Sequence, residues 1–173
     1  AEKKLDELAR PLDELCKQQE QLNEKMDQNS PENSKQNSEQ QKKLSEEMKK
    51  IEQEMKQLAE QMKKDQIQGE QKAQELKKEM EEEQLSEQME QNSQSMQMCQ
   101  NQSAKKQGKK QQKKMSEMAQ KMQDMRQQMQ QDQDMETMME MEKARDKMLD
   151  LSMRQEQLWQ ESQEMDPNSP QMR

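Results

Sequence analysis

Residues 44–62 read LSEEMKKIEQEMKQLAEQM, and residues 115–129 read MSEMAQKMQDMRQQM. In both stretches the apolar side chains recur at alternating intervals of three and four residues, which is the spacing of the a and d positions of a coiled coil. This spacing predicts two amphipathic helices, each with one narrow apolar seam. The two seams consist of Leu44, Met48, Ile51, Met55, Leu58 and Met62, and of Met115, Met118, Met122, Met125 and Met129.

The composition leaves only long helices or disorder as possible states of the chain. Of the 173 residues, 26% are hydrophobic and 38% are charged, and there are 21 Met, one Trp and no Phe or Tyr. About half of an ordinary globular domain is apolar, so we expect no compact core. Gln, Glu, Lys, Met and Leu favour helices. The sequence therefore predicts an all-α fold of extended helical hairpins, an antiparallel coiled coil of about three long helices.

Breaks in the apolar pattern predict where these helices begin and end within one elongated unit. Polar stretches rich in Asn, Ser and Pro are typical of loops, and proline inside a helix removes a backbone donor. The chain starts at Ala1, and we interpret it as a fragment of a larger protein. We expect a short helix over 1–27 kinked at Pro11, a loop over 28–38, a long coiled-coil helix over 39–90, a turn over 91–103, a long Met-rich helix over 104–165 and a tail over 166–173.

Chain reversals near residues 34 and 97 would fold the helices back on one another. The first reversal places Leu22 opposite residues 44–48. The second places a run of carboxylates opposite a run of lysines, and such charge complementarity favours one register of two antiparallel helices. The runs are Glu79, Glu81, Glu82, Glu83, Glu87 and Glu90, and Lys105, Lys106, Lys109, Lys110, Lys113 and Lys114.

The apolar seam of the last helix changes register after Met129. It slips through Asp132 and Asp134, and such a slip changes the local supercoil. Trp159, the only aromatic residue, lies beside Leu158, and tryptophan is a frequent interface anchor, although packing within a helical protein is an equal alternative. Together with Trp159, Leu151 and Leu158 complete the predicted interaction seam. The resumed seam reads Met141, Ala144, Met148, Leu151, Gln155, Leu158 and Met165.

Residues with catalytic or ligand-binding chemistry are scarce. There is no His, and the two Gly are isolated, so the chain offers neither a proton-transfer group near neutral pH nor a phosphate-binding loop. We expect no enzyme activity and no cofactor. Met96, Met98 and Cys99 are soft sulfur ligands that would suit Cu(I), whereas a turn in a methionine-rich chain is the simpler interpretation. Cys16 and Cys99 are expected to be free thiols.

Nucleic acid and membrane are not expected as direct partners of these residues. The formal net charge is −8, whereas a dedicated nucleic-acid binder is basic. The lysine run over 105–114 has no interleaved aromatic residue to stack on bases. The chain contains no stretch of about 18 apolar residues. We therefore expect protein partners and no membrane segment in this chain.

Residues 101–167 resemble a known group of proteins. The likeness rests on residues 104–106 (AKK), 114–118 (KMSEM), 149–158 (LDLSMRQEQL) and 165–167 (MDP). This region is similar to the C-terminal helical region of the large bacterial envelope proteins of the domain-of-unknown-function 4175 family. The resemblance implies a membrane-anchored precursor whose helical part lies in the periplasm of Gram-negative bacteria, especially Bacteroidota.

Three functions follow from this pattern. The first is a structural or interaction element, a Met-rich coiled-coil rod that docks onto or braces a larger envelope protein complex. The alternative is a periplasmic, chaperone-like binder that holds clients between Met-lined helices, because flexible methionine surfaces adapt to varied partners. Cu(I) binding at the Met96–Cys99 cluster is a minor third possibility.

Overall fold

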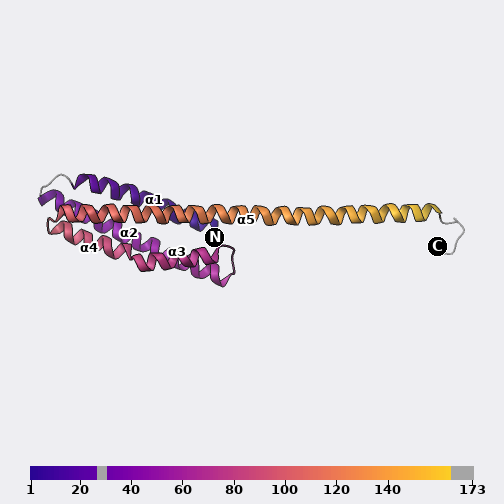
Figure 1. The fold of residues 1–173 in the computed structure, drawn as a ribbon, viewed down its shortest axis with the longest axis horizontal. Coiled ribbons are helices and arrows are strands. Elements are labelled where there is room, and N and C mark those ends of the chain that lie inside the picture. Colours follow the sequence, from indigo (N-terminus) through magenta and orange to yellow (C-terminus); the bar gives the residue numbers. More distant parts are fainter. Residues whose placement is uncertain (27–30, 165–173) are drawn as a thin grey trace. The chain divides into compact units, whose positions relative to one another are not determined.

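The computed structural model describes residues 1–26 and 31–164, and this part of the chain is all-α, with five helices and no strand (Figure 1). The predicted all-α class is confirmed. The contacts divide the chain into two units, residues 1–130 and 131–173, and the last helix belongs to both. The helices are α1 (Glu2–Lys25), α2 (Pro31–Lys64), α3 (Glu70–Glu83), α4 (Leu85–Gln97) and α5 (Asn101–Glu164).

Helices of the first unit lie side by side and run in alternating directions. Lys4 near the start of α1 donates a hydrogen bond of 2.8 Å to Gln61 near the end of α2. Lys114 of α5 contacts Glu83 of α3 at 2.5 Å, and Arg126 of α5 pairs with Asp6 of α1. These contacts join an antiparallel bundle with four columns of helix. The first column is α1, the second is α2, the third is α3 followed by α4, and the fourth is the part of α5 up to residue 130. We call this unit the bundle.

The single long helix predicted over 39–90 is interrupted twice. The chain reverses over residues 65–69, where Gly69 adopts a φ of +87°, a left-handed conformation that glycine adopts at no steric cost. A second interruption lies at Gln84, with a φ of 45°. Gly69 therefore lies at the end of the turn that joins α2 to α3. Two shorter helices, α3 and α4, stand where the sequence predicts that the long helix continues.

Other predicted boundaries are corrected as well. Residues 31–38 of the predicted loop belong to α2, and residues 28–30 lie outside the described part of the chain. The predicted turn over 91–103 shrinks to residues 98–100, because α4 continues to Gln97 and α5 begins at Asn101. α1 is continuous through Pro11, and the predicted kink at this residue stays a prediction. The predicted tail over 166–173 and Met165 also lie outside the described residues.

The two predicted seams form the core of the bundle. All eleven of their apolar residues are buried, from the fully enclosed Met48 and Met55 to Met129, which is 9% exposed. Leucines of α1 and methionines of α3 and α4 pack against them. Burying a Met or Leu side chain is worth about 1.5–3 kcal/mol, and the unbranched methionine fills irregular gaps. A compact core therefore does form, contrary to the expectation from composition.

A carboxylate of α2 caps the first turn of α4. Glu52 accepts two hydrogen bonds from Ser86, one of 3.1 Å from the backbone N–H and one of 2.6 Å from the hydroxyl. The first N–H groups of a helix have no partner within the helix, and a negative charge is favourable at this end. The interruption at Gln84 is thus stabilised by a neighbouring helix.

Candidate functional site

Side chains of the C-terminal segment, residues 131–164, form the most distinctive surface of the chain. Eleven large hydrophobic side chains are strongly exposed in the described part, and ten of them lie in this segment. Their exposed fractions run from 53% to 72%, although soluble proteins rarely leave many large apolar groups together in water. The ten are Met135, Met138, Met139, Met141, Met148, Leu149, Leu151, Met153, Leu158 and Trp159.

Four of the ten exposed side chains, Met141, Met148, Leu151 and Leu158, lie on the predicted seam, and the other six lie on other sides of the helix. The seam positions within the described residues share one helix face. Leu151 and Leu158 are 60% and 64% exposed, and the adjacent Trp159 is 60% exposed. The structure thus places these three predicted interaction residues on an open surface. The described seam consists of Met141, Ala144, Met148, Leu151, Gln155 and Leu158.

The buried stripe of the bundle ends at Met129 for a reason visible in the sequence. Continuing the stripe by three and then four residues leads to Asp132 and Glu136, whose carboxylates do not suit a core position. The new seam begins at Met141 on a different face of the helix. The predicted change of register after Met129 therefore coincides with the boundary between the two units at residue 130.

A layer of buried amides crosses the bundle, and the sequence pattern did not predict it. Gln19 and Gln41 exchange two hydrogen bonds of 2.9 and 2.8 Å. Asn92 donates to Gln41 at 3.4 Å and to Gln111 at 3.3 Å, and Gln19 also donates to Asn23 at 3.2 Å. All four columns contribute. We call Gln19, Asn23, Gln41, Asn92 and Gln111 the polar layer.

The polar layer tolerates little additional volume. A Cβ added to Gly108 of α5 would overlap Asn23 Oδ1 and lie 2.9 Å from Gln19 Nε2. Among the described residues, Asn92 Oδ1 is buried without a hydrogen-bond partner. Buried polar groups are costly unless they are paired, so the layer constrains which helices can meet and in which register.

The signal for the polar layer is a polar residue at a seam position. Gln19 lies between Leu15 and Leu22 at intervals of four and three residues, and Asn92 lies between Met89 and Met96 at intervals of three and four. In the sequence, Gln19 interrupts the apolar spacing of the first helix. In the structure it is a fully buried member of the seam.

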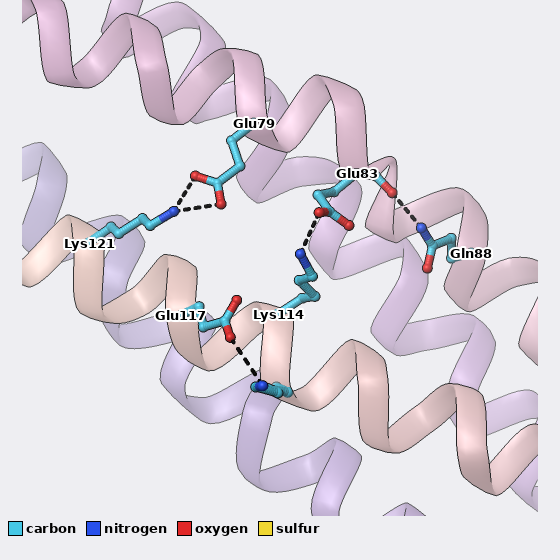
Figure 2. A network of polar contacts seen from close by, with 7 residues as sticks. Glu79, Glu83, Gln88, Lys114, Glu117 and Lys121 are labelled. Atoms are coloured by element: carbon cyan, nitrogen blue, oxygen red, sulfur yellow. Dashed lines mark hydrogen bonds and ion pairs between the residues drawn. The ribbon is translucent and has the colours of Figure 1, made fainter.

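Two ion pairs join α3 to α5, and one of them, between Glu83 and Lys114, joins the two predicted charge runs. Lys114 contacts Glu83 at 2.5 Å, and Lys121 contacts Glu79 at 2.6 Å (Figure 2). The hydrogen bond and charge of Glu83 raise the pKa of Lys114 above its ordinary value. Glu83 also accepts a hydrogen bond of 2.6 Å at its backbone carbonyl from Gln88. The predicted reversal near residue 97 is confirmed, whereas Lys121 lies beyond the lysine run.

The first hairpin has a different register from the predicted one. Gln19 pairs with Gln41, whereas the sequence places Leu22 opposite residues 44–48. The reversal falls earlier in the chain than residue 34, because α2 already begins at Pro31.

The three sulfur-containing residues of the predicted Cu(I) cluster differ in their exposure to solvent. Met96 is fully buried in the core, Met98 is 64% exposed, and Cys99 is exposed in a left-handed turn with a φ of 58°. Among the described residues no group of three or more His, Cys, Asp or Glu is arranged to hold a metal ion. Copper binding at Met96, Met98 and Cys99 stays a prediction that the fold does not strengthen.

The two cysteines, which both lie in the described part of the chain, are free thiols. Cys16 belongs to α1, and its thiol donates a weak hydrogen bond of 3.8 Å to the carbonyl oxygen of Gln112 in α5. Burial, followed by the charges of Asp13 and Glu20, raises the pKa of Cys16 to about 12. A thiol held neutral in this way is a poor nucleophile and a poor metal ligand.

No family model, curated protein or solved structure matches this chain. Among the described residues, no helix is both long enough and apolar enough to span a membrane.

Proposed function

We propose that this chain is a structural and interaction element without catalytic activity, in which the C-terminal segment docks onto a protein partner in a larger complex. The bundle is the folded body of the element. The contact surface is the exposed seam from Met141 to Leu158, together with the adjacent Trp159. The envelope location and the membrane-anchored precursor are part of this proposal and rest on the family resemblance.

One observation carries the proposal, namely the concentration of exposed apolar side chains in a single segment. Ten of the eleven strongly exposed large hydrophobics in the described part lie within residues 131–163. Contiguous exposed apolar surface marks interaction sites, and an amphipathic helix docks through anchors spaced by three and four residues. The two other seams are already occupied within the bundle, so they are not available to a partner.

The test compares two matched double variants of the full chain. Leu151→Gln with Leu158→Gln removes two seam anchors, whereas Glu136→Gln with Lys143→Gln changes the charged side of the same segment. Both proteins would be used to capture partners from an envelope extract of the native host, followed by mass spectrometry. We expect the first variant to lose the partner set and the second to retain it. An unchanged partner set with the first variant would refute the proposal.

A chaperone-like client binder is the second candidate, and the composition of the exposed face favours it. Six of the ten exposed side chains are methionine, which adapts to partners of different shape. A client binder would suppress the aggregation of several unrelated unfolded proteins, and a docking element would bind one fixed set. Suppression that survives Leu151→Gln with Leu158→Gln would count against a client site on this segment.

A further inference from the structure

The exposed seam has the residue pattern of a self-associating helix. We propose that residues 138–163 pair with the same residues of a second copy of this chain as a parallel, in-register, two-stranded coiled coil. This inference rests on the proposed function, because it names the occupant of the same apolar surface. Within the bundle, Met98 is the one strongly exposed large hydrophobic side chain of the described residues, so exposed apolar side chains are concentrated in the C-terminal segment.

The seam positions define the layers of such a dimer. Met141, Met148 and Gln155 occupy a positions, and Ala144, Leu151 and Leu158 occupy d positions. In a parallel dimer each of these side chains packs against its own copy. Leucine at d is compatible with two strands. All six residues are exposed in the isolated chain, which leaves the whole seam open for a second helix.

Gln155 selects the parallel and in-register arrangement. A single polar residue at an a position specifies register and number of strands, because a shifted or antiparallel partner would leave its polar group buried against apolar side chains. An amide carries both a donor and an acceptor, so Gln155 can bond to Gln155 of the second copy. The bundle already uses this device, since Gln19 and Gln41 exchange two hydrogen bonds at seam positions.

Charges beside the seam favour the parallel dimer over the antiparallel one. Glu140, Lys147, Arg154 and Glu161 occupy g positions, and Arg145 and Trp159 occupy e positions. In a parallel dimer g faces the next e of the other strand, which joins Glu140 to Arg145 and Arg154 to the ring of Trp159. The guanidinium over an indole is a favourable cation–π arrangement.

The antiparallel alternative brings like charges together. Centred on the middle of the seam, it places Glu140 opposite Glu161 and Lys147 opposite Arg154. Shifting the centre by half a heptad changes both contacts. One direction places Glu140 opposite Arg154 and Lys147 opposite its own copy, and the other places Lys147 opposite Glu161 and Arg154 opposite its own copy. Each of these three registers, which keep most of the seam paired, therefore retains at least one repulsive contact, and like-charge juxtaposition disfavours a wrong pairing.

The decisive experiment is sedimentation equilibrium of the full chain over a range of concentrations. We expect a monomer–dimer equilibrium, because a seam with Met, Ala and Gln positions supports reversible association. Glu140→Arg and Arg145→Glu should each weaken the dimer at least tenfold through Arg–Arg or Glu–Glu contacts, and the double exchange should restore it. Glu136→Arg and Lys143→Glu make the same charge changes at c positions, away from the contact, and should leave the dimer constant unchanged.

Strand orientation is read from disulfide crosslinking in a Cys16→Ser, Cys99→Ser background. Met141→Cys faces its own copy only in the parallel dimer, so the single variant should crosslink under oxidised glutathione. A mixture of Met141→Cys and Leu158→Cys chains should gain no heterodimer beyond chance. Preferential Met141–Leu158 crosslinks, or a double charge exchange that fails to restore association, would overturn the parallel model.

Self-association and partner docking fail in distinguishable ways. A chain that stays monomeric throughout, yet loses a host partner when Leu151 and Leu158 become Gln, overturns the dimer and keeps the proposed docking function. A monomeric chain with no such partner overturns both. A dimer that the charge exchange controls as described supports self-pairing whatever the partner capture gives.

Discussion

Gln19 of α1 and Gln41 of α2 exchange two hydrogen bonds, 2.9 and 2.8 Å long, in the fully buried interior of a methionine and leucine core. Each amide satisfies the other, and Asn92 of α4 adds a third donor at 3.4 Å. Polar networks in low dielectric stabilise when they are complete and destabilise when one member is lost. The pair therefore aligns the first hairpin more specifically than the interchangeable apolar layers around it.

Replacing Gln19 by Ala should destabilise the bundle by about 1–3 kcal/mol, because Gln41 would be left with unpaired buried polar groups. Equilibrium urea unfolding followed by circular dichroism measures the change. Gln21→Ala, an exposed position on the same helix, is the matched control and should have little effect. Replacing both Gln19 and Gln41 by Leu should cost less than the single Ala variant, because no Gln41 amide is then left unpaired and Asn92 keeps its hydrogen bond to Gln111. A double Leu variant that is less stable than Gln19→Ala would contradict this account.

Gly69→Ala should destabilise the bundle by about 1–2 kcal/mol, the usual cost of a side chain in the left-handed region. Gly69 has a φ of +87°, and an added Cβ would lie 3.2 Å from Met129 Cγ. Thermal unfolding of Gly69→Ala should show a lower midpoint, and Gly69→Asn should recover part of the loss, because Asn tolerates this conformation. Equal destabilisation by Ala and Asn would instead point to the contact with Met129.

Cys16 should react with iodoacetamide far more slowly than Cys99 at pH 9. The pKa of Cys16 is raised from 9.0 to about 12, so its reactive thiolate is scarce, whereas Cys99 is exposed. Mass spectrometry of the Cys16→Ser and Cys99→Ser variants separates the two rates. Because the folded-state pKa is raised, the neutral thiol stabilises the fold below pH 9, and this contribution is lost as the pH rises from 9 towards 12. Equal alkylation rates in the folded protein would refute the buried thiol.

Much of the bundle could be predicted from the spacing of apolar residues. Seams such as that from Leu44 to Met62 can be recognised in the sequence, because the apolar residues of a helix that buries one face recur every 3.5 to 3.6 residues, whatever the helix packs against. The reversal near residue 97 could also be predicted, since the carboxylate and lysine runs lie opposite each other only in an antiparallel arrangement. For the same reason the pattern did not reveal whether each partner helix lies within the chain. The seam at Met122 is buried and the seam at Leu151 is exposed, yet their sequences look alike.

The polar layer and the extra helices could not be predicted in this way. Gln, Asn and Ser are common throughout this chain, and only a tertiary contact distinguishes the buried Gln41 from the many solvated glutamines. Ser38 and Ser93, which were assigned to loops, lie in helices and bond to each other at 3.0 Å. Their small side chains suit a close approach of α2 and α4. The turn at Gly69 is recognisable only once α2 and α3 are seen to pack, because an isolated glycine is also compatible with a helix interior, at a cost of about 1 kcal/mol.

Exchanging the charges of Glu83 and Lys114 should test whether ion pairs set the register of α3 against α5. Glu83→Lys and Lys114→Glu should each lower the midpoint of thermal unfolding slightly, because the 2.5 Å contact becomes repulsive, and the double exchange should recover most of the loss. The half-exposed pair is screened by salt, so the differences should shrink at about 1 M NaCl, where the Debye length is about 3 Å. Glu82→Lys, whose carboxylate pairs with Lys78 on the same helix, controls for the change in net charge. If Glu82→Lys lowered the midpoint as much as Glu83→Lys, or the double exchange gave no recovery, net charge rather than this contact would account for the effect.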